Sequence, residues 1–173
     1  IWVIDHSTTT AEAASHTGGK SGKGGDLLYR WGNPVVYRAA GAQKFFFQHD
    51  AQWIDEGCPG AGNILVFNNG VNRPDGMYSS VDEIAPPVNE QGEYYHIPGS
   101  AYGPTYQSGI YTANPPTSLY SSIMGGAERL RNGNILICRS HLGRFFEMTP
   151  TGEKVWEFTN TSVETGYIFK IDF

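Results

Sequence analysis

A histidine at the start of a predicted strand is the residue in this sequence best suited to chemistry. His49 follows three phenylalanines, Phe45 to Phe47, in "KFFFQHDAQWI" (44–54), where an alternating segment begins. A neutral imidazole can act as a nucleophile. It can equally be a turn or core residue held by a backbone carbonyl, and the residue types alone leave both interpretations open.

Short strands separated by turns must position this histidine. An alternating pattern, typical of half-buried strands, is assigned to "IWVID", "DLLYRW", "NILVF" and "NILIC", and the strands "RFFEM" and "KVWEF" follow at short intervals. Glycines and prolines, 22 and 10 in number, are spread without a strict period and mark many turns. A helix of one or two turns is predicted only in "STTTAEAASH" (7–16), with Ser7 or Thr8 as its N-cap and Glu12 completing a capping box.

One four-stranded unit is predicted to occur twice. "GAGNILVFNNG" (60–70) returns as "RNGNILICRSH" (131–141), with a polar turn before each apolar strand. The first unit starts at "HDAQWI" and continues through "SSVDEI" and, after a long insertion, "PTYQSGIYTA". The second starts at "GGAERL" and continues through "RFFEMTPTGEKVWEF". Ahead of both, "IWVID" and "DLLYRWGN" resemble the last two strands of an earlier unit.

Tandem four-stranded units with a tryptophan near the end of the outer strand are typical of β-propeller blades. We therefore predict an all-β fold with about two and a half antiparallel blades of a ring that closes with roughly 4 to 8. Residues 1–36 would end one blade, 45–114 and 122–160 would form the next two, and 167–173 would begin a further strand. An all-β sandwich is the second candidate, although a sandwich does not require the repeat.

This number of blades cannot close a ring alone. Ile1 begins within a strand pattern, so we expect the chain to be a fragment or a processed product of a longer protein. Either the remainder of the propeller or further copies of the chain in a homo-oligomer would complete the ring.

The second repeat lacks the histidine of the first. When the repeats are aligned, Gly125 and Gly126 stand opposite His49 and Asp50. A histidine that only supported blade packing would be expected to have a polar or bulky counterpart. We therefore predict that His49 performs a task carried out once in the protein.

Composition argues against several classes of protein. The content of aromatic residues, 13%, and the low fraction of charged residues, 17%, argue against disorder. The net charge of -5 argues against nucleic acid as a partner, and no apolar run is long enough for a membrane span. Cys58 and Cys138 have no CxxC spacing, so a zinc site is not predicted, and whether they pair stays open.

Other motifs are interpreted as structural. The loop "HTGGKSGKGGD" lacks the spacing of a phosphate-binding loop and precedes a strand, not a helix. His6 and His16 match no metal-ligand pattern and are expected in capping or surface roles, while His96 and His141 are expected to be structural or exposed. We predict neither a metal nor a cofactor.

Three segments resemble the arylsulfate sulfotransferase family. They are "IWVIDHSTTTAEAASHTGGKSGKGGDLLYRWGNP", "QHDAQWI…GAGNILVFNNGVNRPDG" and "GGAERLRNGNILICRSHLGRFFEMTPTGEKVWEF", and together they cover most of the chain. The resemblance implies a six-bladed propeller, of which this chain is a C-terminal-side fragment, in a bacterial enzyme that is periplasmic or secreted. It also implies transfer of a sulfuryl group from an aryl sulfate to a phenol without a nucleotide sulfate donor.

The resemblance assigns roles to particular residues. His49 fits the histidine that is transiently sulfated, in a covalent ping-pong scheme. Arg73 is the candidate for binding the sulfate oxygens because its planar fork suits an oxyanion, and Asn69 is a candidate donor to the substrate. The family also uses His-x-Asn and Ser-x-Arg segments from blades before Ile1, so we expect these 173 residues not to turn over substrate by themselves. The alternative function is a non-catalytic propeller that serves as a binding or scaffolding module.

Overall fold

The computed structural model describes residues 1–140, 143–161 and 168, and these form two compact units. One unit combines Ile1–Lys44 with Pro86–Tyr106, and the other combines Phe45–Ala85 with Gln107–Phe173. The described residues fold into three antiparallel sheets of two, four and four strands with little helix, so the all-β prediction is confirmed.

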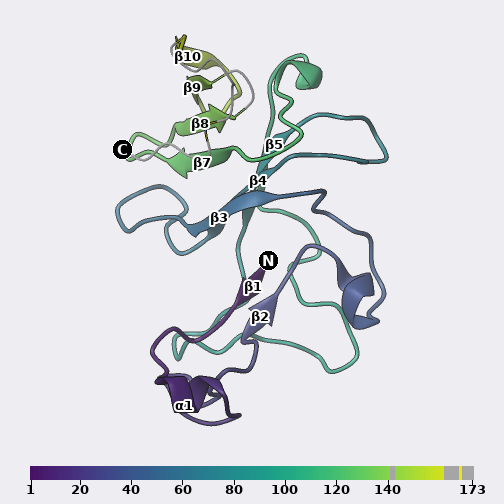
Figure 1. The fold of residues 1–173 in the computed structure, drawn as a ribbon, viewed down its shortest axis with the longest axis vertical. Coiled ribbons are helices and arrows are strands. Elements are labelled where there is room, and N and C mark those ends of the chain that lie inside the picture. The colour runs from purple at the N-terminus through teal and green to yellow at the C-terminus, as the bar shows by residue number, and fades with distance from the viewer. Residues whose placement is uncertain (141–142, 162–167, 169–173) are drawn as a thin grey trace. The chain divides into compact units, whose positions relative to one another are not determined.

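The first four-stranded sheet carries the candidate histidine at one strand end. Its strands are β3 (His49–Trp53), β4 (Ile64–Asn68), β5 (Ser80–Ile84) and β6 (Gly109–Tyr111). They lie side by side in chain order, as Figure 1 shows for β3, β4 and β5. Every residue of β4 and β5 is buried, so the alternating pattern predicted for "NILVF" is wrong: both faces of this strand are covered, and its residues form a continuous apolar run.

The second four-stranded sheet repeats this arrangement. Its strands are β7 (Gly126–Arg129), β8 (Ile135–Arg139), β9 (Arg144–Met148) and β10 (Lys154–Thr159), again in chain order (Figure 1). "NILVF" and "NILIC" are therefore the second strands of two separate sheets, as the repeat predicts, and they do not pair with each other. The predicted further strand at 167–173 lies outside the described residues, except for Ile168.

The two four-stranded sheets share one hydrophobic core. Its buried side chains come from β4 and β5 on one side and from β7, β8 and β9 on the other, with Leu119 from the intervening loop. A buried ion pair adds a polar link between the sheets: Nη2 of Arg129 in β7 lies 2.6 Å from Oε2 of Glu83 in β5. The hydroxyl of Tyr111 and the side-chain amide of Asn63 also bond to the Glu83 carboxylate. These bonds supply the partners that a buried charge requires.

Both cysteines are reduced thiols in this fold. Sγ of Cys58 lies 3.4 Å from the carbonyl oxygen of Arg129, and Sγ of Cys138 lies 3.6 Å from that of Ile168. The two do not pair. Burial and the charge of Asp50 raise the pKa of the Cys138 thiol to about 12.

The other unit contains the predicted pairing of "IWVID" with "DLLYRW". Strand β1 (Trp2–Val3) pairs antiparallel with β2 (Tyr29–Arg30), forming a two-stranded sheet. Tyr29 is fully buried, stacks on Tyr94 at 5.0 Å and donates its hydroxyl to the carbonyl oxygen of Gly103 at 2.7 Å. Residues 86–106, the insertion between β5 and β6, thus belong to this unit rather than to the sheet that they interrupt.

The segment between β1 and β2 is held by two carboxylates. Glu12 bonds back to the backbone N–H of Thr9 at 2.7 Å, and Thr9 caps α1 (Thr10–Ala13). The predicted capping box is therefore present, but Thr9, rather than Ser7 or Thr8, is its N-cap. The carboxylate of Asp5 accepts from the hydroxyl of Ser7 and from the backbone N–H groups of Ser21 and Ser7, and these bonds hold the pKa of Asp5 well below its usual range.

Short helices complete the described chain. The 3-10 helix η1 (Pro34–Tyr37) is capped by Asn33, and a second 3-10 helix, η2, covers Pro116–Ser118. In the described part of the chain, no helix has the length and apolar character that crossing a membrane would need.

Candidate functional site

His49 lies at the first position of β3, half-buried, beside the residue that follows β4. Its Nδ1 atom is 2.8 Å from Oδ1 of Asn69 and 3.2 Å from the carbonyl oxygen of Phe47. Strand pairing produces this contact, because His49 is opposite Phe67 in the β3–β4 ladder and β4 ends at Asn68, the residue before Asn69. The structure thus brings together two of the three residues that the sequence nominated.

The orientation of the Asn69 amide is set by its surroundings. Asn69 is fully buried, and its Nδ2 donates to the carbonyl oxygens of Ser121 and Met124, both at 2.7 Å. Because carbonyl oxygens only accept, the other end of the amide, Oδ1, must be the atom that faces His49. Nδ1 of His49 must then be the protonated nitrogen, and in the neutral ring the lone pair resides on Nε2.

A buried polar network supports this amide. The hydroxyl of Ser79 donates to the backbone carbonyl oxygen of Asn69 at 3.0 Å, and it accepts from the backbone N–H of Ser121 at 2.9 Å. All three residues are fully buried. Satisfied buried networks of this kind fix one arrangement of their members, so the acceptor of His49 is held rigidly.

Backbone strain is concentrated around the same histidine. Only five non-glycine residues of the described chain have a left-handed φ. Three belong to this site: Phe47 (64°), whose carbonyl contacts His49, Asp50 (49°), the next residue, and Met124 (55°), whose carbonyl holds Asn69. Each such residue costs of order 1–3 kcal/mol, and strain of this kind is found preferentially at functional sites.

The glycines of the second repeat have a packing cause. A side chain at Gly126 would place its Cβ 2.3 Å from Oδ2 of Asp50, and one at Gly125 would place it 2.7 Å from Cε1 of Phe67. In the β3–β4 ladder, His49 pairs with Phe67 and Ala51 pairs with the adjacent residue of β4. Asp50, between them, has no partner in β4 and forms a β-bulge. Its carboxylate accepts from the backbone N–H of Ala127 at 3.1 Å.

The bulge at Asp50 also corrects the alignment of the repeats. Gly126 pairs with Cys138 as His49 pairs with Phe67, so the counterpart of His49 is Gly126 rather than Gly125. Since the two glycines make room for the neighbouring sheet, their presence is no argument for a unique task of His49. That argument rests instead on the fixed tautomer and the strained backbone.

Arg73 lies at the same end of the β4–β5 ladder. Its Nη2 donates to Oγ of Ser80 at 2.9 Å, and Ser80 pairs with Asn68, the residue before Asn69. The guanidinium stacks on the ring of Tyr78 at 4.3 Å, and its buried Nε has no hydrogen-bond partner among the described residues. Arg73 is therefore a cation held in place by Ser80 and Tyr78.

Asn69 differs from its expected role as a donor to the substrate. Both of its N–H groups are used by backbone carbonyls, and its oxygen faces His49. It is a positioning residue for the imidazole. Of the phenylalanines before His49, Phe45 is buried in the core, whereas Phe47 is exposed.

The other histidines have the roles expected for them where the structure describes them. His6 is exposed, and Nδ1 of the exposed His16 lies 2.7 Å from Oδ1 of Asp26. His96 stacks on Tyr102 with ring centroids 3.8 Å apart and bonds to the carbonyl oxygen of Ser100. His141 lies outside the described residues.

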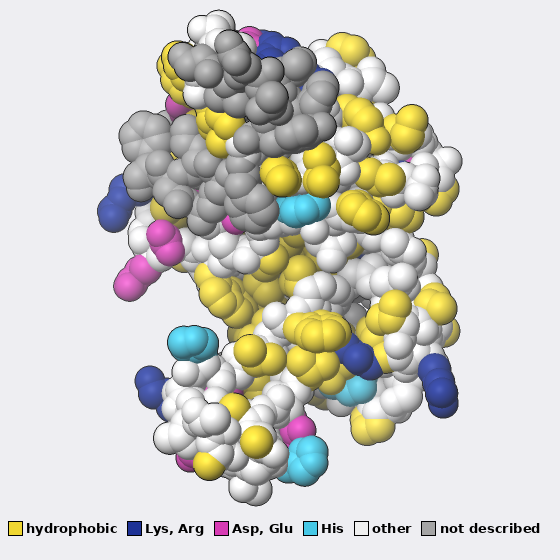
Figure 2. Space-filling view, viewed as in Figure 1, with side chains coloured by type: hydrophobic (Ala, Val, Ile, Leu, Met, Phe, Trp, Pro, Cys, Tyr) yellow, Lys and Arg dark blue, Asp and Glu magenta, His cyan; other side chains and the backbone are white. Residues whose placement is uncertain are grey.

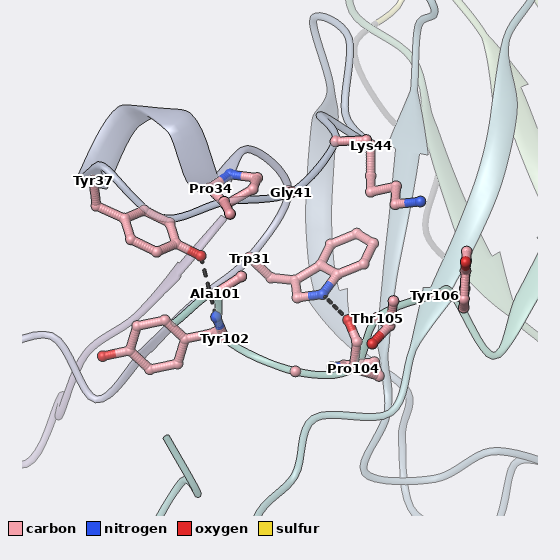
Figure 3. Close-up of a pocket in the computed structure, with 14 residues that line it drawn as sticks. Trp31, Pro34, Tyr37, Gly41, Lys44, Ala101, Tyr102, Pro104, Thr105 and Tyr106 are labelled. Carbon is pink, nitrogen blue, oxygen red and sulfur yellow. Dashed lines mark hydrogen bonds between the residues drawn. The ribbon is translucent and has the colours of Figure 1, made fainter. Parts of the chain in front are cut away.

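Sequence reasoning missed an aromatic cavity in the unit formed by residues 1–44 and 86–106. The cavity has a volume of about 320 Å³, and its walls include Trp31, Tyr37, Tyr102 and Tyr106 (Figure 3). The segment containing Trp31 was interpreted only as a strand. The available signal was the clustering of Trp, Tyr and Pro in two segments far apart in the sequence.

Charge does not single out another site on the visible face. Within each compact unit, Figure 2 shows the visible Lys and Arg side chains as separate spots rather than as a continuous patch. Comparisons of the chain with protein-family models, with curated proteins and with solved structures found no match.

Proposed function

We propose that His49 is the nucleophile of a sulfuryl-transfer enzyme that moves the group from an aryl sulfate to a phenol. The observation that carries the proposal is the hydrogen bond from Nδ1 of His49 to Asn69, an acceptor whose own orientation is fixed by two carbonyls. This bond leaves the nucleophilic lone pair on Nε2 without requiring a base to remove a proton. The resemblance of the sequence to arylsulfate sulfotransferases supports the choice of substrate class.

The first step is an in-line displacement at sulfur. The Nε2 lone pair forms the N–S bond as the bond between sulfur and the aryl oxygen breaks, and the leaving phenolate carries away that electron pair. The ring becomes cationic as the bond forms, so the Nδ1–H bond to Asn69 strengthens in the transition state. A second phenol then attacks the same sulfur, loses its proton to solvent and restores neutral His49.

Arg73 is proposed to bind the oxygens of the transferring group. Sulfuryl transfer, like phosphoryl transfer, depends on positioning and on positive charge around the equatorial oxygens. The guanidinium of Arg73 is held in place by the hydroxyl of Ser80 and the ring of Tyr78. A cation fixed before substrate binding costs no reorganisation during the reaction.

We further propose that the two four-stranded sheets are neighbouring blades of a six-bladed β-propeller and that the protein is periplasmic or secreted. The chain-order sheets, their shared core and their repeated second strand support the blades. A structure of the native protein tests the architecture: six sheets arranged around a central channel are expected, and a closed sandwich of two sheets would contradict the proposal.

Trapping of the intermediate tests the function. The native protein that carries this sequence is incubated with p-nitrophenyl sulfate and no acceptor, and its intact mass and the released p-nitrophenolate are measured. One sulfo group per chain, mapped to the peptide containing "FFFQHDAQW" and removed by added phenol, is the expected result.

A matched histidine substitution separates this chemistry from nonspecific labelling. His49→Ala should lose the label and turnover, whereas His6→Ala, at an exposed histidine, should keep both. A label on another histidine, or undiminished turnover by His49→Ala, would overturn the assignment. Absence of both label and phenolate release would favour the non-catalytic binding module.

A further inference from the structure

The cavity in the unit formed by residues 1–44 and 86–106 has the form of a small-molecule site. Its volume, about 320 Å³, falls at the lower end of the range of ligand pockets, roughly 300–1,000 Å³, and suits a ligand of one or two rings. All of its lining residues belong to this unit, and they come from two segments, 31–44 and 101–106 (Figure 3).

Hydrogen bonds hold the aromatic walls in place. Trp31 is 5% exposed, and its Nε1 donates to the carbonyl oxygen of Pro104 at 2.7 Å. The hydroxyl of Tyr37 accepts from the backbone N–H of Tyr102 at 3.2 Å, and their two rings meet edge to face with centroids 5.9 Å apart. Figure 3 shows both bonds tying the first segment to the second. Rigid aromatic walls recognise flat apolar rings with little loss of conformational entropy.

The charge carried by the cavity lining is positive. Lys44 is its single charged side chain, and none of the 14 lining residues is Asp or Glu. Nζ of Lys44 lies 4.6 Å from the ring centroid of Tyr106, which is 71% exposed. The Tyr37 hydroxyl, which accepts from Tyr102, still has a proton to donate. These groups would favour a negative substituent and disfavour a positive one.

We infer that this cavity binds a small planar aromatic anion, with the ring among Trp31, Tyr37, Tyr102 and Tyr106 and the negative group near Lys44. The inference rests on this unit alone and does not depend on the reaction at His49. It provides a second site for a ligand that is neither transferred nor cleaved there. A neutral sugar or a cation could also meet aromatic faces, but neither would use the Lys44 charge.

Calorimetric titration with 1-naphthoate tests the inference. The expected result is one binding event per chain, with much weaker binding of cyclohexanecarboxylate, which lacks the aromatic ring, and of naphthylmethylammonium, which reverses the charge. His49→Ala should bind 1-naphthoate as the parent chain does. A lack of 1-naphthoate binding at this cavity can therefore be told apart from a lack of the proposed sulfuryl transfer at His49.

Substitutions at two lining residues, the half-buried Lys44 and the exposed Tyr106, locate the binding. Lys44→Gln and Tyr106→Ala should each weaken 1-naphthoate affinity about tenfold, the effect of losing one favourable contact worth 1.4 kcal/mol. Lys20→Gln and Tyr95→Ala, at an exposed lysine and a tyrosine that is 69% exposed, are the matched controls and should leave affinity unchanged. No binding by the parent chain, equal affinity in all four variants, or tighter binding of the ammonium probe would overturn the inference.

Discussion

Nδ1 of His49 lies 2.8 Å from Oδ1 of Asn69, and the N–H groups of that amide are held by the carbonyl oxygens of Ser121 and Met124. The carbonyl oxygens of Ser121 and Met124 therefore act on the imidazole tautomer through Asn69, and the carbonyl oxygen of Phe47, 3.2 Å from Nδ1, favours the same tautomer directly. Because the selecting groups are buried and part of the fold, the arrangement is preformed before any substrate arrives.

Asn69→Ala should release this tautomer. Without Oδ1 of Asn69 as the acceptor for Nδ1–H, the Nε2-protonated form of His49 should gain population. The ¹⁵N chemical shifts of the ring should report the change. Turnover should fall, although the backbone around His49 should keep its fold. Asn132→Ala, at an exposed asparagine, is the control. An unchanged ratio of tautomers in Asn69→Ala would contradict the positioning role.

Arg73→Ala should lower kcat/KM for p-nitrophenyl sulfate by an amount on the order of 2 to 4 kcal/mol of transition-state stabilisation, as loss of one preorganised donor does. Arg73→Lys should recover only part of the loss, because an ammonium lacks the planar fork. Steady-state kinetics measures both, with Arg131→Ala at an exposed arginine as the control. Full activity of Arg73→Ala would remove Arg73 from the site.

The Glu83–Arg129 ion pair should be costly to break from one side. Arg129→Met removes the cation that pairs with the almost fully buried Glu83 carboxylate. The free energy of unfolding is expected to fall by about 3–5 kcal/mol. Adding Glu83→Gln should recover part of that loss, because the uncompensated charge disappears. Urea denaturation of the two single variants and the double variant gives the coupling.

An exposed ion pair provides the comparison. Lys154 contacts Glu157 on β10, where Lys154 is half exposed, and Lys154→Met should cost no more than about 1 kcal/mol. Equal losses from Lys154→Met and Arg129→Met would show that burial of the Glu83–Arg129 pair has no energetic consequence.

Stability should fall in alkaline solution because of Cys138. In the folded state its thiol keeps its proton up to a pKa of about 12, whereas an unfolded thiol loses it near the ordinary value of 9.0. Between these values the unfolded chain binds fewer protons than the folded one, so the free energy of unfolding decreases as pH rises. Denaturation at a series of pH values should show a shallower decline for Cys138→Ala than for the parent chain. Parallel curves would exclude Cys138 as the cause.

These 173 residues by themselves should self-associate. β10 is the last strand of its sheet among the described residues, and it exposes three large apolar side chains, Val155, Trp156 and Phe158. An exposed apolar edge strand favours pairing with another chain. Sedimentation velocity should show mass increasing with concentration, and Trp156→Lys should reduce it. A monomer at every concentration would contradict the expectation.

The strands could be predicted from sequence because their patterns are local. The strands at "NILVF" and "NILIC" were found from their apolar residues and the polar turns before them, but their burial on both faces depends on neighbours that a local pattern does not reveal. The predicted N-cap, Ser7 or Thr8, was wrong because a capping box requires Glu12 three residues after the cap, and that spacing selects Thr9.

The site was less accessible to sequence reasoning because it depends on register. One extra residue at Asp50 shifts the repeat alignment, and a bulge has no signature in the residue types around it. The aromatic cavity was missed for a related reason. Trp31 and Tyr102 are far apart in sequence, and only the folded chain shows that they line the same space.

The division of one compact unit into two separate stretches of sequence has a consequence for synthesis. Residues 1–44 leave the ribosome well before 86–106, yet the core partners of Tyr29, among them Tyr94, lie in the later stretch. The aromatic side chains of residues 1–44 therefore stay exposed to solvent while β3, β4 and β5 are synthesised. A chaperone that holds nascent aromatic segments would act during this interval, and a ribosome stalled before residue 86 would display β1 and β2 without their core.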